Sequence, residues 1–130
     1  MAITFNRRKI ALGVGLFYTA IGALGLVPGL AVASGQPGQS LLFGLLGTSD
    51  LLSLVHLAVG LIAIWASQAR VNTRQVLTGL AAAFALLIGA GLVGPVALAL
   101  GLNGADMVVH LVSLLLAGYV GLVEAEPATA

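Results

Sequence analysis

The sequence predicts an all-α polytopic membrane protein, a single domain over residues 1–130 in which four transmembrane helices form an antiparallel bundle. Three observations predict this class. Hydrophobic residues make up 60% of the chain and charged residues only 7%, whereas a soluble domain carries about 25% charged residues. Long apolar runs alternate with short polar links. All five basic residues fall at the N-terminus or in the second link, and these two places lie on one side of a four-span chain.

The first predicted span covers residues 10–27, after the basic start Arg7-Arg8-Lys9 and before Pro28. It is long enough to cross a hydrocarbon core of about 30 Å. A cleaved signal peptide is the competing interpretation, because Ala-Val-Ala at residues 31–33 resembles a small-residue cleavage site. The apolar run exceeds a typical signal core and is interrupted by glycines, so we predict a retained span.

Residues 28–39 have the glycine, proline and glutamine content of a loop. Residues 40–47 are apolar but short, which predicts a re-entrant or interfacial turn. Thr48-Ser49-Asp50 then predicts a helix N-cap. The second span follows over residues 50–66, with Trp65 at the position of an interfacial aromatic residue.

The third span is predicted over residues 75–94 and ends at Pro95, which cannot continue a regular helix. Residues 96–102 either extend this helix beyond a kink or lie at the interface. The fourth span covers residues 106–123, and residues 124–130 form a polar tail. Because Arg70 and Arg74 lie in the second link, the positive-inside rule predicts that both termini are cytoplasmic.

Spans two and four each begin with an aspartate and carry a histidine deeper in the apolar run, which predicts two repeated hairpins. Helical spacing predicts that their polar residues face the bundle interior. The resulting polar cluster near the outer face comprises Asp50, Ser53, His56, Asp106 and His110. Asp106 and His110 are four residues apart, so they can meet directly. Asp50 and His56 are six apart and point to different faces.

Several functions fit this cluster. The two histidines can be neutral, hydrogen-bonded contacts between helices. They can also bind a cofactor, a haem or a metal, with Asp106 orienting His110. A proton or small-ligand path, or ligation of a pigment or lipid, is a further alternative. Two histidines and no cysteine do not make a structural metal site, and the sequence requires no cofactor. No catalytic motif is present, so we expect a protein that is not an enzyme.

Five segments of the chain carry a family resemblance. They are, in order, Gly22-Ala23-Leu24-Gly25-Leu26-Val27-Pro28-Gly29, Leu41-Leu42-Phe43-Gly44-Leu45-Leu46-Gly47, Leu54-Val55-His56-Leu57-Ala58-Val59-Gly60-Leu61, Asn103-Gly104-Ala105-Asp106 and Val109-His110-Leu111. From about residue 10 to residue 122 the chain resembles the DUF4383 family of small bacterial four-span membrane proteins of unknown function.

That family typically has His-Asn-x-x-His in the second span and Asp-Asn-x-x-His in the fourth. The resemblance extends to His56, Asp106 and His110, whereas Leu52, Ser53 and Met107 depart from the pattern. It implies a bacterial cytoplasmic (inner) membrane protein. We therefore expect a structural or accessory subunit that packs against itself or a larger membrane complex. The alternative is a cofactor-, metal- or small-ligand-binding protein that uses His56 and His110. The net charge of +1 gives no indication of a nucleic-acid partner.

Overall fold

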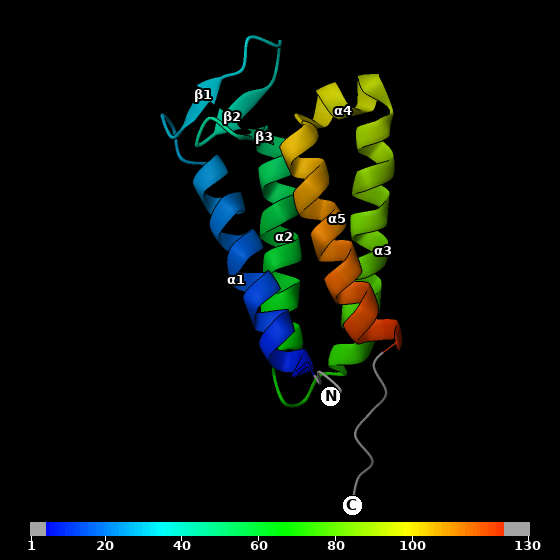
Figure 1. Cartoon of the computed structure of the whole chain (residues 1–130). Coiled ribbons are helices and arrows are strands. Elements are labelled where there is room, and N and C mark those ends of the chain that lie inside the picture. Colours follow the sequence, from blue (N-terminus) through cyan, green and yellow to red (C-terminus); the bar gives the residue numbers. More distant parts are fainter. Residues whose placement is uncertain (1–4, 124–130) are drawn as a thin grey trace, which may run out of the picture.

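The computed structural model describes residues 5–123 and is mostly helical (Figure 1). Its long helices are α1 (Arg7–Gly25), α2 (Asp50–Ala66), α3 (Thr73–Leu92) and α5 (Gly104–Gly118), and the short α4 is Gly94–Leu100. The π-helix η1 (Tyr119–Val123) continues α5. The predicted polar tail, residues 124–130, lies outside the described residues.

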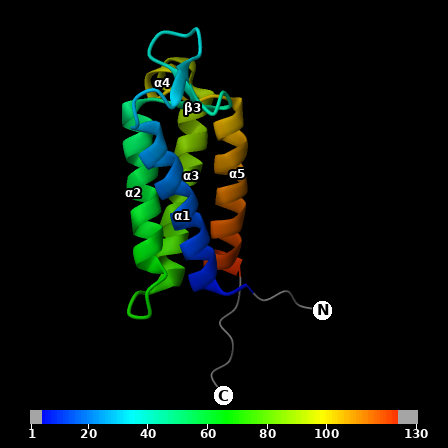
Figure 2. The same cartoon turned by 90° about the vertical axis from the view of Figure 1, so that its left-hand side faces the viewer.

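The four long helices lie side by side, and the chain reverses direction from one to the next (Figures 1 and 2). Two helical segments, Thr73–Leu92 and Gly104–Val123, are long and apolar enough to cross a membrane. The helix Asp50–Ala66 is apolar but shorter. The predicted span boundaries lie within three residues of the ends of α1, α2, α3 and the combined segment of α5 and η1.

A small sheet corrects the all-α prediction. Strands β1 (Ala31–Ala33), β2 (Ser40–Leu42) and β3 (Leu46–Thr48) pair antiparallel in the order β1-β2-β3. Ala31 pairs with Leu42, and Ser40 pairs with Thr48. Glycines with positive φ at positions 35, 38 and 44 interrupt this segment, so it does not form a helix, and strand pairing satisfies its backbone hydrogen-bonding groups instead. The predicted loop and interfacial turn are therefore two hairpins.

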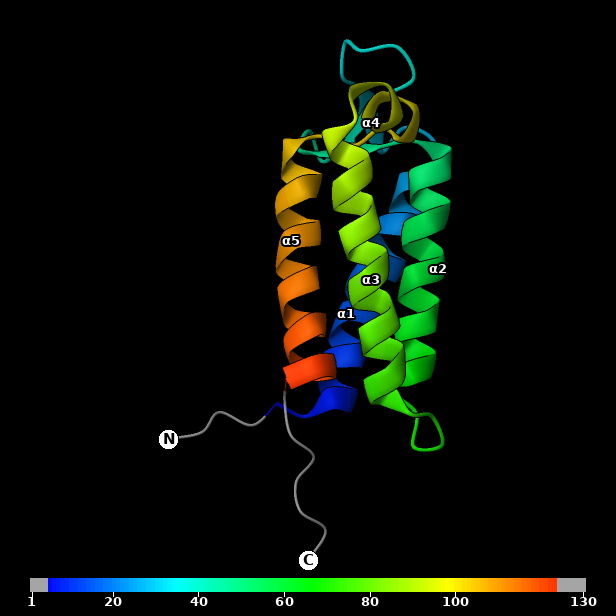
Figure 3. The ribbon, with the colours of Figure 1, turned by 90° about the vertical axis from the view of Figure 1, so that its right-hand side faces the viewer.

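The link between α3 and α5 shows whether residues 96–102 extend the third helix. Val93 has extended backbone, with φ −99° and ψ 102°, so α3 ends at Leu92. Helix α4 then begins with Pro95 in its first turn, where a missing backbone N–H costs no helical hydrogen bond. It ends at Leu100, and Gly101 caps it with a left-handed φ of 77°. Residues 96–102 thus form a separate short helix and its cap, which lie across the sheet end of the molecule (Figure 3).

Close packing between α1 and α2 depends on glycines. A β-carbon at Gly22 would meet the backbone of Ser53 and Leu57, and one at Gly60 would meet the backbone of Thr19. Gly15 likewise lies against Ile64. The two helices therefore approach to backbone contact, which small residues at a helix interface allow.

At the sheet end, hydrogen bonds join the first helical hairpin, α1 and α2, to the second, α3 and α5. Gln39 Nε2 donates to the carbonyls of Gly101 and Leu102, at 3.1 Å each. Ser49 Oγ donates to Leu100 O at 2.7 Å. These bonds fix the α4–α5 connection against the sheet, so the sheet acts as a cap over one end of the helices (Figure 2).

Candidate functional site: a ring cluster between the two hairpins

Four aromatic rings, one from each long helix, meet in the interior. They belong to Tyr18 of α1, His56 of α2, Phe84 of α3 and His110 of α5, which we call the ring cluster. Tyr18, Phe84 and His110 are fully buried, and His56 is 5% exposed. The Tyr18 ring centroid lies 5.3 Å from that of His56, 5.0 Å from that of Phe84 and 6.3 Å from that of His110. These separations are typical of favourable aromatic packing.

The two histidines bond to each other. Their Nε2 atoms lie 3.1 Å apart, and their rings are inclined at 60°. A hydrogen bond between two imidazole nitrogens needs one protonated and one bare nitrogen. The pair is therefore joined by a single proton, and it links α2 of the first hairpin to α5 of the second.

A second bond crosses between the hairpins beside the first. Tyr18 Oη lies 2.8 Å from Ser113 Oγ, and Ser113 Oγ donates to Val109 O at 2.8 Å. A carbonyl oxygen can only accept, so the serine proton is directed to Val109 and the tyrosine hydroxyl donates to the serine. This order places both hydroxyl protons in bonds that do not involve the histidines.

A fully buried nitrogen of the ring cluster lacks a hydrogen-bond partner among the described residues. Within the described residues, His110 Nδ1 is buried and makes no hydrogen bond. An unpaired buried nitrogen is unfavourable, and it is least so when the atom is a bare acceptor without an N–H. This favours the tautomer in which His110 Nε2 carries the proton and donates it to His56 Nε2.

The predicted contact between Asp106 and His110 is wrong. Asp106 Oδ2 accepts from the backbone N–H of Asn103 at 2.8 Å, and Asn103 Oδ1 accepts from the backbone N–H of Asp106 at 3.1 Å. The Gly47 backbone also hydrogen-bonds the Asp106 carboxylate. Asp106 is thus the reciprocal partner in a capping box, buried at the start of α5 and tied to strand β3. Helical spacing permitted the Asp106–His110 contact, but backbone N–H groups occupy the carboxylate.

The remaining predicted cluster members lie apart from the histidines. Ser53 Oγ is buried and bonds Thr48 Oγ1 at 2.8 Å. Asp50 is exposed in the first turn of α2, where Ser49 provides the cap by accepting from Leu52 N–H. Asp50 instead lines an open cavity of about 370 Å³ at the sheet end, together with Thr48, Ser40 and the turn after α1. The structure brings together only the two histidines of the five predicted residues.

Sequence reasoning did not place Tyr18 and Phe84 in the site. Tyr18 is the one large polar side chain on the buried face of α1, where it lies between Gly15 and Gly22, and that position could have identified it. Phe84 is an aromatic residue in an alanine-rich helix, and no pattern in the sequence distinguishes it.

The ring cluster offers limited ligand chemistry. Within residues 5–123, no group of three or more histidine, cysteine or acidic side chains could hold a metal ion. A haem with two histidine ligands needs its iron between the two nitrogens, whereas here the nitrogens are in direct hydrogen-bond contact at 3.1 Å. The arrangement suits helix association more directly than coordination.

Comparison with known proteins gives one match. The model of a family described as a domain of unknown function, DUF4383, matches residues 8–123. No curated protein and no solved structure matches the chain.

Proposed function

Because the chain belongs to the DUF4383 family, whose description names no activity, we propose a function from its physical chemistry: a small integral membrane protein with a structural or accessory role. It crosses the bilayer four times and packs against itself or a larger membrane complex. The proposed location is the cytoplasmic membrane of a bacterium, with both termini in the cytoplasm.

The observation that carries this proposal is the distribution of polar and apolar side chains. Large apolar residues face outward from the helices: Leu86 is 75% exposed, Leu92 77% and Leu115 63%. Polar side chains face inward, among them His110 and Asp106. A protein dissolved in water has the opposite arrangement, since exposed apolar surface of this extent is unfavourable there. Lipid is the solvent that suits this surface.

Helix length supports four crossings. Helix α3 has 20 residues, which at about 1.5 Å per residue span about 30 Å, the thickness of a hydrocarbon core. The four long helices lie side by side over the same height (Figures 1 and 3). If α3 and α5 cross the bilayer, α1 and α2 are carried through it with them.

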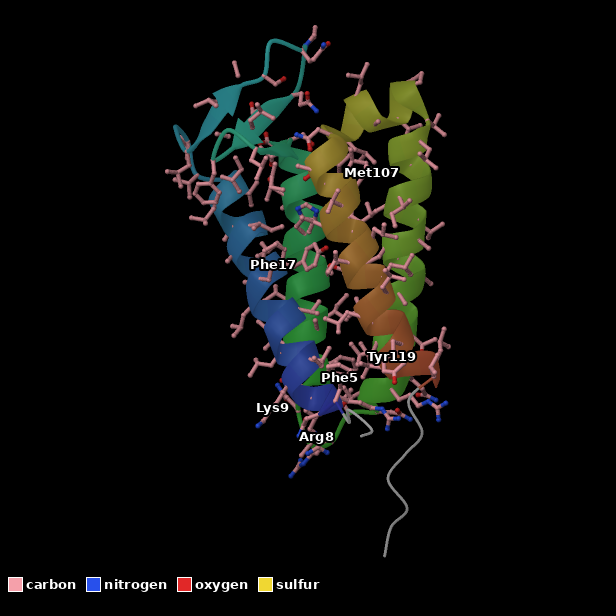
Figure 4. The ribbon with its side chains drawn as sticks, in the orientation of Figure 1. Phe5, Arg8, Lys9, Phe17, Met107 and Tyr119 are labelled. Carbon is pink, nitrogen blue, oxygen red and sulfur yellow. The ribbon has the colours of Figure 1, made fainter. Side chains whose placement is uncertain are left out.

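The ends of the helices differ in charge. Arg8 and Lys9 lie at the end opposite the sheet, where Phe5 and Tyr119 also lie (Figure 4). Arg74 is held there by a 3.0 Å bond from its Nε to Gly121 O. Basic residues favour the cytoplasmic side and aromatic residues favour the interface, so this end is proposed to face the cytoplasm.

Membrane integration is tested by fractionation. Membranes from cells expressing the full chain are washed with alkaline carbonate, which strips peripheral proteins. The chain is expected to stay in the pellet and to leave it only with detergent. Release into the supernatant by carbonate alone would contradict the proposal.

The accessory role is tested separately by purification in a mild detergent. We expect the chain to elute as a homo-oligomer or with a reproducible membrane partner identified by mass spectrometry. A monomer with no co-purifying protein would contradict the accessory role and leave the membrane assignment intact.

The second candidate is a cofactor-, metal- or small-ligand-binding protein that uses His56 and His110. The unpartnered Nδ1 of His110 favours it, because a bound group could satisfy that atom. An absorbance spectrum and elemental analysis of the purified protein test this candidate. A colourless, metal-free sample without a bound organic molecule would eliminate it.

A further inference from the structure

The turn between β2 and β3 has an unusual conformation for its sequence. Leu45 N–H donates to Leu42 O at 3.1 Å and closes a turn whose central residues are Phe43 and Gly44. Both have positive φ, 55° and 68°. Phe43 is the one non-glycine residue with positive φ among residues 5–123. Asparagine or glycine normally occupies such a position, because a bulky β-carbon is strained there.

The fold does not use the Phe43 side chain in its core. Phe43 is 68% exposed and Leu45 is 63% exposed, whereas Leu42 beside them is 2% exposed. A residue with a strained backbone and a mostly exposed apolar side chain adds little to the stability of the fold. The structural role of this turn would be met better by asparagine, which indicates that Phe43 serves an interaction outside the chain.

The turn is held firmly in place. Asn103 Nδ2 donates to Leu45 O at 2.8 Å, and the same residue caps the N-terminus of α5. The Gly47 backbone bonds the carboxylate of Asp106. The tip therefore keeps a fixed position beside the first turn of α5 (Figure 2).

The two turns of the sheet differ in chemistry. The β1–β2 connection, residues 34–39, reads Ser-Gly-Gln-Pro-Gly-Gln and projects beyond the end of the molecule (Figure 1). The β2–β3 turn lies in the segment Leu-Leu-Phe-Gly-Leu-Leu, residues 41–46, which has no polar side chain. It lies at the level where α2 and α5 begin, and there Leu51 and Val108 are also exposed. The exposed apolar side chains of the turn thus lie at the same level as the outermost exposed apolar side chains of α2 and α5.

We propose that Phe43 and Leu45 insert into the boundary between headgroups and acyl chains of the outer leaflet, and so anchor the sheet at a fixed depth. This inference rests on the proposed membrane location. Its occupant is lipid, because the apolar tip lies at the upper limit of the apolar helix surface and its segment carries no charge or hydrogen-bonding side chain with which to recognise a polar partner.

Single-tryptophan fluorescence tests the proposal. The chain has one tryptophan, Trp65, which is 54% exposed near the opposite end. A Phe43→Trp, Trp65→Phe variant is reconstituted into phosphatidylcholine vesicles whose acyl chains carry bromine either near the headgroup or near the methyl end. We expect blue-shifted emission that is quenched more strongly by the bromine near the headgroup.

The matched control is Gln36→Trp, Trp65→Phe, in the polar turn of the same sheet. Its emission should resemble that of tryptophan in water and should be quenched by aqueous acrylamide. Water-like emission from position 43 would overturn the anchor. Blue-shifted emission that brominated lipid does not quench would also overturn it, because protein would then cover the tip.

The wild-type Trp65 separates this inference from the membrane proposal. Quenching of Trp65 by brominated lipid with none at position 43 would refute the anchor alone. No quenching at either position would refute membrane insertion itself. A Phe43→Asn variant provides a second measurement. It should melt in detergent at a temperature no lower than the wild type, and a lower melting temperature would show that Phe43 serves the fold.

Discussion

His56 Nε2 and His110 Nε2 lie 3.1 Å apart in the interior, so one shared proton joins the first helical hairpin to the second. Beside this bond, the Tyr18 hydroxyl reaches Ser113 across the same interface. The contacts within the first hairpin are glycine-mediated and close, whereas the interior contact between the hairpins includes hydrogen bonds and stacked rings. We interpret the ring cluster as a buried polar connection between the two halves.

Removing the His110 side chain should destabilise the protein. His110→Ala leaves a cavity among three rings and removes the partner of His56, so the free energy of unfolding should fall by about 2–4 kcal/mol. Thermal unfolding in detergent, followed by circular dichroism, measures this change. Val108→Ala on the outward face of the same helix is the control, and its effect should stay within about 0.5 kcal/mol. Equal effects of the two variants would contradict a structural role for His110.

The coupling between the two histidines can be measured directly. A double-mutant cycle with His56→Ala and His110→Ala should give an interaction energy of about 0.6 kcal/mol, and at most about 1.7, which is the range for hydrogen bonds between helices of membrane proteins and follows from the proposed location. The pair Leu61→Ala and Val108→Ala, both on outward faces, should be additive. Additivity at His56 and His110 would show that the bond contributes nothing to stability.

Glycine at position 22 should be required for the α1–α2 contact. A β-carbon there would lie 2.5 Å from the backbone nitrogen of Leu57 and 2.7 Å from Ser53 O, so Gly22→Ala must push the helices apart. We expect a loss of about 1–3 kcal/mol in unfolding experiments. Gly13→Ala is the matched control on the same helix, because open space surrounds that position. A neutral Gly22→Ala would mean that α1 and α2 are not in backbone contact.

The proposed orientation can be checked by cysteine labelling, since the chain contains no cysteine. A Gln36→Cys variant places a thiol in the exposed β1–β2 turn, and Gln68→Cys places one in the exposed link between α2 and α3. A membrane-impermeant maleimide should label position 36 in cells with an accessible outer face of the cytoplasmic membrane, and position 68 only after permeabilisation. The reverse labelling pattern would show that the proposed topology is inverted.

The sequence alone identified the helices and the direction in which most of their faces point. Apolar runs longer than a typical soluble helix defined four segments, and polar residues at intervals of three and four defined the inward faces. Asp106 and His110, which were predicted to face the interior, are buried in α5 together with Ser113 and Ala117. These features are local, because they depend on the period of the helix and on the cost of exposing a polar group to lipid.

The partners of those inward residues depended on the tertiary structure. Asp106 is four residues from His110, yet its carboxylate bonds the backbone of Asn103 and Gly47, and His110 turns to a histidine on another helix. Tyr18 and Phe84 complete the ring cluster from helices whose sequences do not indicate it. The sheet was also missed, since strands of three residues carry too short a pattern to recognise. Helical periodicity fixes which face of a segment is buried, but the position of each helix beside its neighbours decides which of the buried groups meet.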